Sequence, residues 1–195
     1  MKKILRIGIF GGSFDPVHIG HIGLARAAKL QYKLDKVIFV PAKYPPHKIS
    51  KRLSSPAVRL KMLRAALNNT AAFSVSRFEL VRSGTTYTYQ TLKHFKKVYP
   101  GAELFFLLGK DSLLDVKNWK NAGLLPRLCG FIAAGRAGAF GHAPAWLTAN
   151  TEFISGKLPT VSSSGIRKDI SLGKSVSRLL PRGVAGLIKK YAPYR

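Results

Sequence analysis

The chain has 195 residues, 46% of them hydrophobic, which fits one compact domain with a sizeable core. Its 33 lysines and arginines against 8 acidic residues give a formal net charge of +25. This excess indicates an anionic partner, which can be a nucleotide, a nucleic acid or a membrane surface, although the scattered basic residues also suit a solvated surface. We expect one domain over residues 1–195, including a C-terminal helical segment from about residue 162 onward.

Cysteine content and the N-terminal sequence favour a cytoplasmic protein. Cys129 is the single cysteine and lies in an apolar stretch, so an internal disulfide is excluded and a buried, hydrophobic role is expected. The first apolar stretch is interrupted by Arg6 and is too short for a secretory signal. Because no other run approaches membrane-spanning length, we expect a soluble chain without a membrane partner.

Five apolar, strand-like runs alternate with segments of helical periodicity, at residues 6–10, 36–40, 73–78, 104–108 and 128–134. This alternation predicts an α/β fold with an open, Rossmann-like, mostly parallel sheet and helices on both faces. Ser55 and Pro56 form an N-cap and first-turn pair, and Thr88 can cap a later helix. The helices are expected over residues 56–67, from 88 to about 99, and from about 181 to 191. Residues 41–54 and 135–149 are candidates for a mobile flap.

The most informative segment follows the first strand. There, Gly11-Gly12-Ser13-Phe14 leads into a predicted helix start, which brings free backbone N–H groups to one point. His18 and His21 lie three residues apart, on the same face of that helix's first turn. Taken alone, each histidine can equally be a cap or a surface residue, but together with the glycine turn they indicate an anion site. The segment lacks the Gly-x-Gly-x-x-Gly and Gly-Lys-Ser/Thr patterns, so histidine would hold the anion rather than a loop lysine.

Three more clusters lie where anions can bind. A proline-stiffened stretch after the second strand ends in His47-Lys48, and Gly109-Lys110-Asp111 follows the fourth strand. Ser162-Ser163-Ser164-Gly165-Ile166-Arg167 places hydroxyls and an arginine at a predicted helix start. A surface turn, a helix-capping aspartate and a serine N-cap are the alternative interpretations of these three clusters. Four anion sites on such loops predict one polyphosphate ligand.

The sequence favours no resident metal. It shows no cysteine and histidine spacing suited to zinc, and no serine, histidine and aspartate order typical of a hydrolase triad. A bound metal is expected to be Mg²⁺ carried by the phosphates, with Asp15 as a candidate outer partner.

The motifs at the two ends of the chain are together a family signature. Gly11-Gly12-Ser13-Phe14-Asp15-Pro16-x-His18-x-Gly20-His21 and Val161-Ser162-Ser163-Ser164-x-Ile166-Arg167 resemble the nucleotidyltransferase superfamily that carries a His-x-Gly-His motif. Between them lie Pro45-Pro46-His47-Lys48, Glu79 followed by Thr86-Tyr87-Thr88, and Gly109-x-Asp111-Ser112-Leu113 with Trp119. The combination covers nearly the whole chain and resembles the bacterial nicotinate-nucleotide adenylyltransferases.

The resemblance implies a nucleotidyltransferase-type fold and adenylyl transfer from ATP to nicotinate mononucleotide, a step of NAD biosynthesis that yields nicotinate adenine dinucleotide and pyrophosphate. It implies that Mg²⁺ arrives on the ATP phosphates. The implied catalytic residues at the phosphates are His18, His21, Lys48 and Arg167. The implied ATP-binding residues are Gly11, Gly12, Ser13, Phe14, Gly20, Gly109, Asp111, Ser162, Ser163 and Ile166. Those for the mononucleotide are Thr85, Thr86, Tyr87, Trp119 and Arg136.

The sequence departs from the family pattern at Lys110, at Lys120 and after Arg136, where a proline is usual. These departures concern the mononucleotide pocket. Phosphopantetheine adenylyltransferases share both end motifs but are shorter and are not expected to carry the middle ones. His18-Ile19-Gly20-His21 is also the class I aminoacyl-tRNA synthetase signature, and the net charge suits nucleic acid. The second motif of that class would fall too early here, so no dedicated nucleic-acid partner is expected. The preference for nicotinate over nicotinamide, and homo-oligomer formation, stay open.

Overall fold

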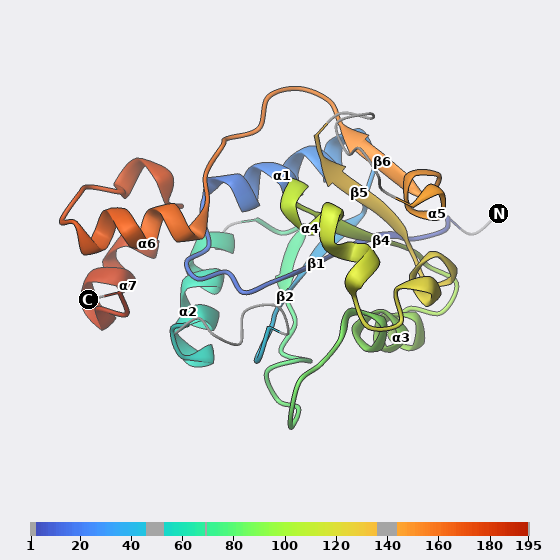
Figure 1. Cartoon of the computed structure of the whole chain (residues 1–195), viewed down its shortest axis with the longest axis horizontal. Coiled ribbons are helices and arrows are strands. Elements are labelled where there is room, and N and C mark those ends of the chain that lie inside the picture. Colours follow the sequence, from blue (N-terminus) through green and yellow to red (C-terminus); the bar gives the residue numbers. More distant parts are fainter. Residues whose placement is uncertain (1–2, 46–52, 69, 136–143, 195) are drawn as a thin grey trace.

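The computed structural model describes residues 3–45, 53–68, 70–135 and 144–194, and a six-stranded parallel sheet forms its centre (Figure 1). The strand order is β3-β2-β1-β4-β5-β6, and each neighbouring pair is parallel. The strands are β1 (Arg6–Gly12), β2 (Lys36–Pro41), β3 (Phe73–Val75), β4 (Glu103–Leu108), β5 (Gly130–Ala134) and β6 (Thr151–Ile154). The Rossmann-like fold predicted from the alternation is therefore confirmed.

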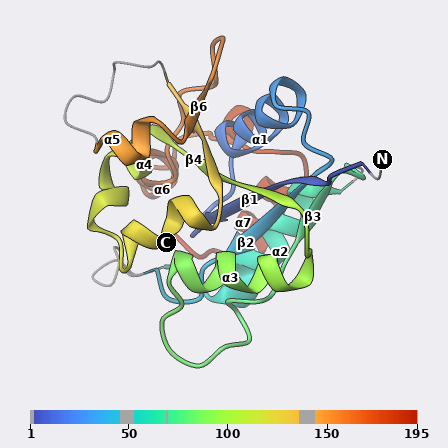
Figure 2. The same ribbon diagram turned by 90° about the vertical axis from the view of Figure 1, so that its right-hand side faces the viewer.

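Helices cover both faces of the sheet. The α-helices are α1 (Ile19–Gln31), α2 (Pro56–Leu67), α3 (Thr88–Val98), α4 (Lys110–Asp115), α5 (Ala145–Thr148), α6 (Ser163–Ser171) and α7 (Val184–Tyr191). Short 3-10 turns follow at η2 (Val116–Asn118), η3 (Ala122–Arg127) and η4 (Ser177–Leu179). In Figure 2, α1 and α3 lie on opposite sides of the strands.

Two hydrophobic clusters, one on each face, explain this layering. Successive side chains of a strand point to opposite faces, so Ile9 and Phe10 enter different clusters. The Phe10 cluster packs α1, α2, α6 and α7 against the sheet, and the Ile9 cluster packs α3, α4 and η3. Cys129 is buried in the Ile9 cluster, where burial raises the pKa of its thiol to about 12, as expected for a residue with a packing role.

The predicted elements differ from the observed ones at several boundaries. Residues 76–78 and 128–129, predicted as parts of strands, lie outside β3 and β5. Strand β6 was missed, because it is four residues long, lies at the sheet edge and includes the exposed Glu152, so its residues form no apolar run. Helix α3 begins at Thr88, but Tyr87 rather than Thr88 occupies the N-cap position. Helix α7 begins at Val184 instead of Pro181, since Gly183 before it has a φ of 84°.

Of the remaining sequence predictions, the helix cap at Ser55 can be compared with the structure, whereas much of the two flap segments cannot. Ser55 caps α2 as predicted, accepting a hydrogen bond of 3.3 Å from the backbone N–H of Val58. Residues 46–52 and 136–143, in the two expected flaps, lie outside the described residues. In the part of the chain that the structure describes, no helix is long and apolar enough to cross a membrane.

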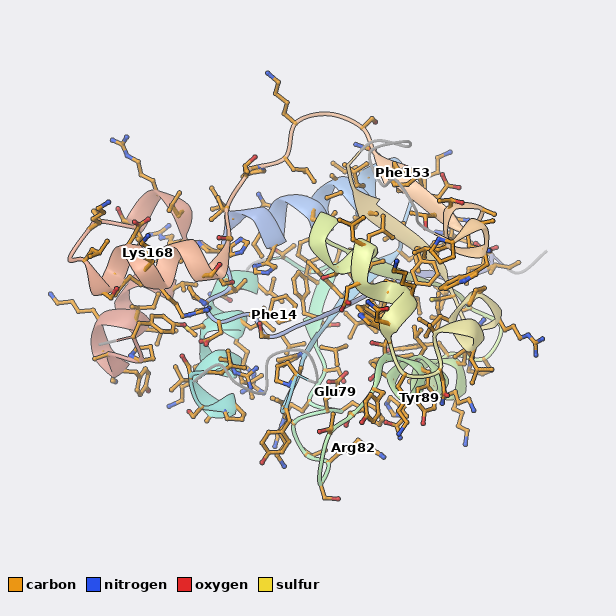
Figure 3. The ribbon with its side chains drawn as sticks, in the orientation of Figure 1. Phe14, Glu79, Arg82, Tyr89, Phe153 and Lys168 are labelled. Carbon is orange, nitrogen blue, oxygen red and sulfur yellow. The ribbon has the colours of Figure 1, made fainter. Side chains whose placement is uncertain are left out.

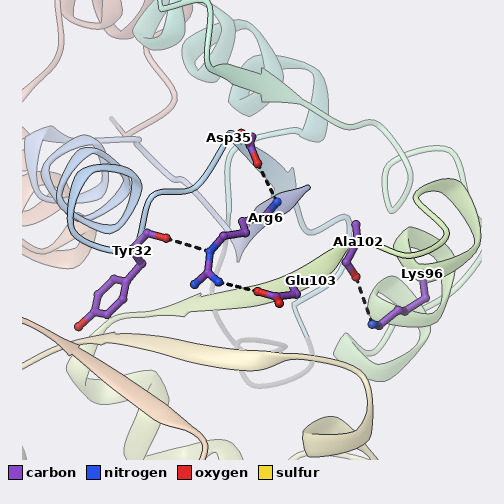
Figure 4. Close-up of polar contacts among 6 residues, drawn as sticks. All are labelled: Arg6, Tyr32, Asp35, Lys96, Ala102 and Glu103. Carbon is purple, nitrogen blue, oxygen red and sulfur yellow. Dashed lines mark hydrogen bonds and ion pairs between the residues drawn. The ribbon is translucent and has the colours of Figure 1, made fainter. Parts of the chain in front are cut away.

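Polar contacts tie the strands at the amino edge of the sheet (Figure 4). The Arg6 guanidinium donates to the Glu103 carboxylate at 2.6 Å and to the Tyr32 carbonyl at 3.2 Å. The Arg6 backbone N–H donates to Asp35 at 2.8 Å, just before β2. These contacts join the starts of β1, β2 and β4, leaving the opposite, carboxyl edge to the loops described next.

Substituting Arg6→Met should lower stability by about 1 kcal/mol, because the Arg6–Glu103 pair is half exposed and surface pairs contribute little. For a chain of this size the loss corresponds to a fall in Tm of about 2–4 °C. Thermal melts of both proteins would measure it, and the difference should shrink in 1 M salt because of screening. An unchanged Tm at low salt would mean that these contacts add no net stability.

Candidate functional site

The strand order places a candidate site at the carboxyl ends of β1 and β4. The chain runs outward from β1 to β2 and β3 on one side, and from β4 to β5 and β6 on the other. At such a switch point the two neighbouring loops diverge and leave a crevice, which is where open α/β sheets bind ligands. The loop after β1 leads into α1, and Gly109 after β4 is the N-cap of α4.

Aromatic packing shapes the glycine turn after β1. Phe14 is 1% exposed, has a φ of 49°, and packs against the rings of Phe10 and Phe39, near the centre of Figure 3. A Cβ on Gly12 would lie 3.0 Å from the Phe14 ring, and one on Gly11 would lie 2.9 Å from Phe106. Both glycines are therefore required by the packing beneath the turn, in addition to any approach of phosphate from above.

His18 and His21 lie together as the spacing predicted. Their rings are stacked, with centroids 3.6 Å apart. His18 is the N-cap residue of α1, and its backbone N–H donates to Nδ1 of His21 at 3.2 Å. Because Nδ1 of His21 accepts this bond, the neutral imidazole carries its proton on Nε2.

His18 is 6% exposed, and burial lowers its pKa from 6.5 to about 4. It is therefore uncharged at neutral pH and acts as a hydrogen-bonding group rather than a cation. Its Nδ1 has no hydrogen-bond partner among the described residues, and an orphaned buried polar atom of this kind is typical of a site that is completed by a ligand.

Gly20 provides the space for the His18 ring. A Cβ at Gly20 would lie 3.0 Å from Nδ1 of His18 and 3.1 Å from the carbonyl oxygen of Pro159. The glycine of the His-x-Gly-His motif thus allows both the histidine and the segment before α6 to approach the first turn of α1.

The C-terminal motif lies directly against the loop after β1. Nη1 of Arg167 donates to the Asp15 carbonyl at 2.6 Å, and Oγ of Ser163 donates to the Pro16 carbonyl at 3.0 Å. Ser162 caps α6 by accepting a bond of 3.1 Å from Gly165, so the capping interpretation of this serine is confirmed. The Ile166 side chain is 1% exposed in the core, which leaves only its backbone for a ligand.

The candidate mononucleotide residues come from two neighbouring segments. Nε1 of Trp119 donates to Asp115 at 3.1 Å, and the Trp119 ring packs edge-on against Phe106. Lys120 places its ammonium 4.7 Å from the ring centroid of Tyr87, which joins the turn after Trp119 to the segment from Thr85 to Tyr87. Thr85 is exposed and Thr86 is buried. The structure thus places the segment that contains Trp119 beside the segment that contains Tyr87.

Three predicted residues receive no side-chain description. Lys48 and Arg136 lie outside the described residues. Asp111 lies in the first turn of α4, beside the N-cap Gly109, and only its backbone is described. The roles expected for these three residues stay predictions.

The residues described here contain no group of three or more His, Cys, Asp or Glu side chains that could hold a metal ion. Asp15, the candidate outer partner of Mg²⁺, is fully buried and accepts hydrogen bonds on both carboxylate oxygens. It therefore does not fit that role.

Two buried charged residues have no role in the sequence predictions: Arg59 was missed, and Glu79 was noted only as a match to the family pattern. Arg59 is 1% exposed and lies on the apolar face of α2 with Met62 and Leu63, at a helical spacing that the sequence does display. Glu79 is 7% exposed, and its carboxylate accepts a 2.7 Å bond from Thr91. Burial raises the pKa of Glu79 to about 7, and the bond from Thr91 opposes this shift.

The comparisons with known proteins agree with this geometry. A family model described as Cytidylyltransferase-like matches residues 9–169. A relative from Thermoanaerobacter sp. (strain X514) is 38% identical over 204 residues, covering 100% of this chain and 97% of the relative. One from Exiguobacterium sibiricum is 40% identical over 190 residues, covering 97% and 99%. Both are named as probable nicotinate-nucleotide adenylyltransferases. This chain belongs to that family.

A solved relative supports the assignment. The nicotinic acid mononucleotide adenylyltransferase of Plasmodium falciparum, described as complexed with NaAD, matches with a TM-score of 0.79 and 25% identity over 97% of each chain. The nucleotidyltransferase-type fold implied by the sequence resemblance is therefore confirmed in this family member.

Substituting Gly20→Ala should impair ligand binding and turnover by roughly tenfold or more, because the new methyl would displace His18, and small misplacements at a site are costly. Steady-state kinetics and melting curves would measure the two effects. Gly186→Ala is the matched control, since Gly186 lies in α7 and a Cβ added there would meet open space. The control should gain about 0.5–1 kcal/mol of stability and keep its activity. Equal activity in the two variants would remove the proposed role of Gly20.

The raised pKa of Glu79 predicts a pH-dependent stability. Its folded pKa of about 7 exceeds the ordinary 4.5, so the folded state binds more protons between these values and stability falls as pH rises through that window. Glu79→Gln should remove this fall, so its Tm relative to the unsubstituted protein should increase from pH 5 to pH 8. Glu152→Gln, at an exposed carboxylate, is the control. A difference between variant and parent that stays constant with pH would contradict the assignment.

Proposed function

We propose that this protein transfers the adenylyl group of ATP to nicotinate mononucleotide, forming nicotinate adenine dinucleotide and releasing pyrophosphate. The observation that carries the proposal is the stacked His18–His21 pair at the start of α1, at the switch point of the sheet, together with the bond from Arg167 of α6 to Asp15 in the loop before that helix. The full-length similarity to relatives of that name supports it.

The two substrates would meet over the carboxyl ends of β1 and β4. The phosphates of ATP would meet the turn from Gly11 to Phe14 and the start of α1, with Lys48 and Arg167 adding charge. Asp111 would accept hydrogen bonds from the adenosine ribose, and Gly109, Ser162 and Ser163 would contact ATP through their backbone. Trp119, the Thr85 to Tyr87 segment and Arg136 would hold the mononucleotide.

The reaction would be an in-line displacement. A phosphate oxygen of the mononucleotide attacks the α-phosphorus of ATP, the bond from that phosphorus to the bridging oxygen of pyrophosphate breaks, and no covalent enzyme intermediate forms. Positioning and charge stabilisation dominate such chemistry. Here the backbone N–H groups and dipole of α1, together with the two imidazoles, would stabilise the negative charge on the phosphoryl oxygens. Mg²⁺ brought in by ATP would offset phosphate charge.

His18 would contribute as a neutral donor. Because its pKa is about 4, the His18 side chain is neutral at every pH well above that value. Its hydrogen bond to phosphate would therefore be available throughout the neutral range. A cytoplasmic location is part of the proposal and is supported by the buried, unpaired Cys129.

The test is pyrophosphate release by the purified protein with ATP and Mg²⁺, using nicotinate mononucleotide and nicotinamide mononucleotide as alternative acceptors. A large preference for the nicotinate form is expected. Equal rates with the two acceptors would support the same reaction with a broader acceptor specificity. Activity with neither acceptor would overturn the proposal, and phosphopantetheine and then tRNA would be the next ligands to assay.

Trp119→Ala should raise the KM for the mononucleotide by roughly tenfold, because stacking of a base on an aromatic ring contributes about 1–3 kcal/mol. The KM for ATP should stay within about twofold, since Trp119 is assigned to the mononucleotide and not to ATP, and its ring packs against Phe106. Trp119→Phe is the control that retains a ring and should recover part of the affinity. Equal changes in the two KM values would contradict the assignment of Trp119.

A further inference from the structure

A polar cluster lies against the loop after β1, and it consists of the buried residues Asp15, Ser54 and Arg59 and the half-buried Tyr194. We infer that this cluster, here called the loop anchor, fixes the position of the phosphate-binding turn and that Arg59, Asp15 and Tyr194 are positioning residues for ATP. The inference rests on the proposed function for the identity of the ligand, but its geometry stands independently.

Arg59 directs its guanidinium at backbone carbonyls. Nη1 donates to Ser13 at 2.9 Å and to Ala42 at 2.7 Å, Nη2 donates to Lys43 at 3.3 Å, and Nε donates to Ser54 at 3.0 Å. These acceptors come from the loop after β1, the segment after β2 and the residue before the N-cap of α2. A planar guanidinium has N–H groups in a fixed fork, so it sets the relative position of all three segments.

The Asp15 carboxylate holds the same loop through two further hydrogen bonds. Its side chain is fully buried, with Oδ2 accepting the Ser54 backbone N–H at 3.1 Å and Oδ1 accepting the Tyr194 hydroxyl at 2.7 Å. Its charge also faces the Arg59 guanidinium, whose pKa is lowered by burial and raised by Asp15. The Asp15 carbonyl meanwhile accepts the bond from Arg167.

Tyr194 reaches this loop from the far end of the sequence, 179 residues away. It follows α7, which packs beside α2 on the left of Figure 1, and its ring packs against the Phe10 cluster. Burial and the neighbouring Asp15 raise the pKa of its phenol, so the hydroxyl stays protonated and donates. The C-terminal residues are thereby joined to the turn that leads to His18.

A gain in folding stability does not by itself explain why these charges are buried. Buried ion pairs commonly add no more stability than well-packed apolar residues, because desolvation offsets the attraction. What the loop anchor supplies instead is a fixed position for Ser13 to Asp15, which lie shortly before the N-cap His18. Since small displacements of binding groups lower turnover steeply, the cluster acts on ATP through the turn without touching it.

Tyr194→Phe is the decisive variant, because it removes one hydroxyl and keeps the packed ring. The Kd of α,β-methylene ATP, measured by titration calorimetry, and the KM for ATP should rise about fivefold or more, because the turn loses one of the bonds that fix it and small displacements of binding groups are costly. The KM for nicotinate mononucleotide should stay within about twofold. Tyr191→Phe is the matched control, since it removes a hydroxyl from the same C-terminal segment whose 2.8 Å bond to Lys61 is exposed. It should change neither constant.

A double-mutant cycle with Asp15→Asn tests the pairing. The effects of Asp15→Asn and Tyr194→Phe on the Kd of the ATP analogue should be non-additive, because they remove parts of one contact. The inference is overturned if Tyr194→Phe behaves as Tyr191→Phe does, if it weakens both substrates equally, or if the two effects simply add. Because calorimetry needs no turnover, failure of the proposed acceptor assay would leave this test intact.

Discussion

The charge buried beneath the first loop is the constraint on which the site depends. An Asp15 carboxylate and an Arg59 guanidinium that are removed from water must find fixed partners, because an unpaired buried charge costs several kcal/mol. Their partners come from the ends of β1 and β2, from the start of α2 and from the C-terminus. Satisfying two charges therefore requires the elements around the site to assemble together, and the start of α1 is fixed as a consequence.

The sequence predicted most where the physical signal is local. Strands β1, β2 and β4 are buried on both faces, so they appear as continuous apolar runs, and the glycine turn after β1 is marked by residue type. The closeness of His18 and His21 follows from helical geometry alone and was predicted correctly. By contrast, β6 is short and lies at an edge, where pairing through the backbone leaves little trace in side-chain pattern.

The residues that sequence reasoning missed act over long distances. A local sequence pattern does mark Arg59, because it is a charged residue on an otherwise apolar helix face. Its four carbonyl partners, however, cannot be derived from residue spacing. No sequence pattern marks Tyr194, because its partner Asp15 becomes its neighbour only when the chain is folded. Gly11 and Gly12 show a related gap, since the sequence indicated a phosphate approach, while the structure adds the rings of Phe14 and Phe106 beneath them.

The net charge of +25 and the chemistry of the site are separate features. Exposed side chains such as Lys168, labelled in Figure 3, act through solvent and are screened beyond about 10 Å at 0.1 M ionic strength. At the start of α1 the buried group is a neutral imidazole, next to backbone N–H groups at a helix N-terminus. Fixed dipoles in a region of low dielectric need no reorganisation when phosphate charge shifts, so they suit phosphoryl chemistry better than mobile surface lysines. In the proposed reaction, the surface charge would raise the local concentration of a polyanion, and the neutral groups held by Gly20 and the loop anchor would orient it.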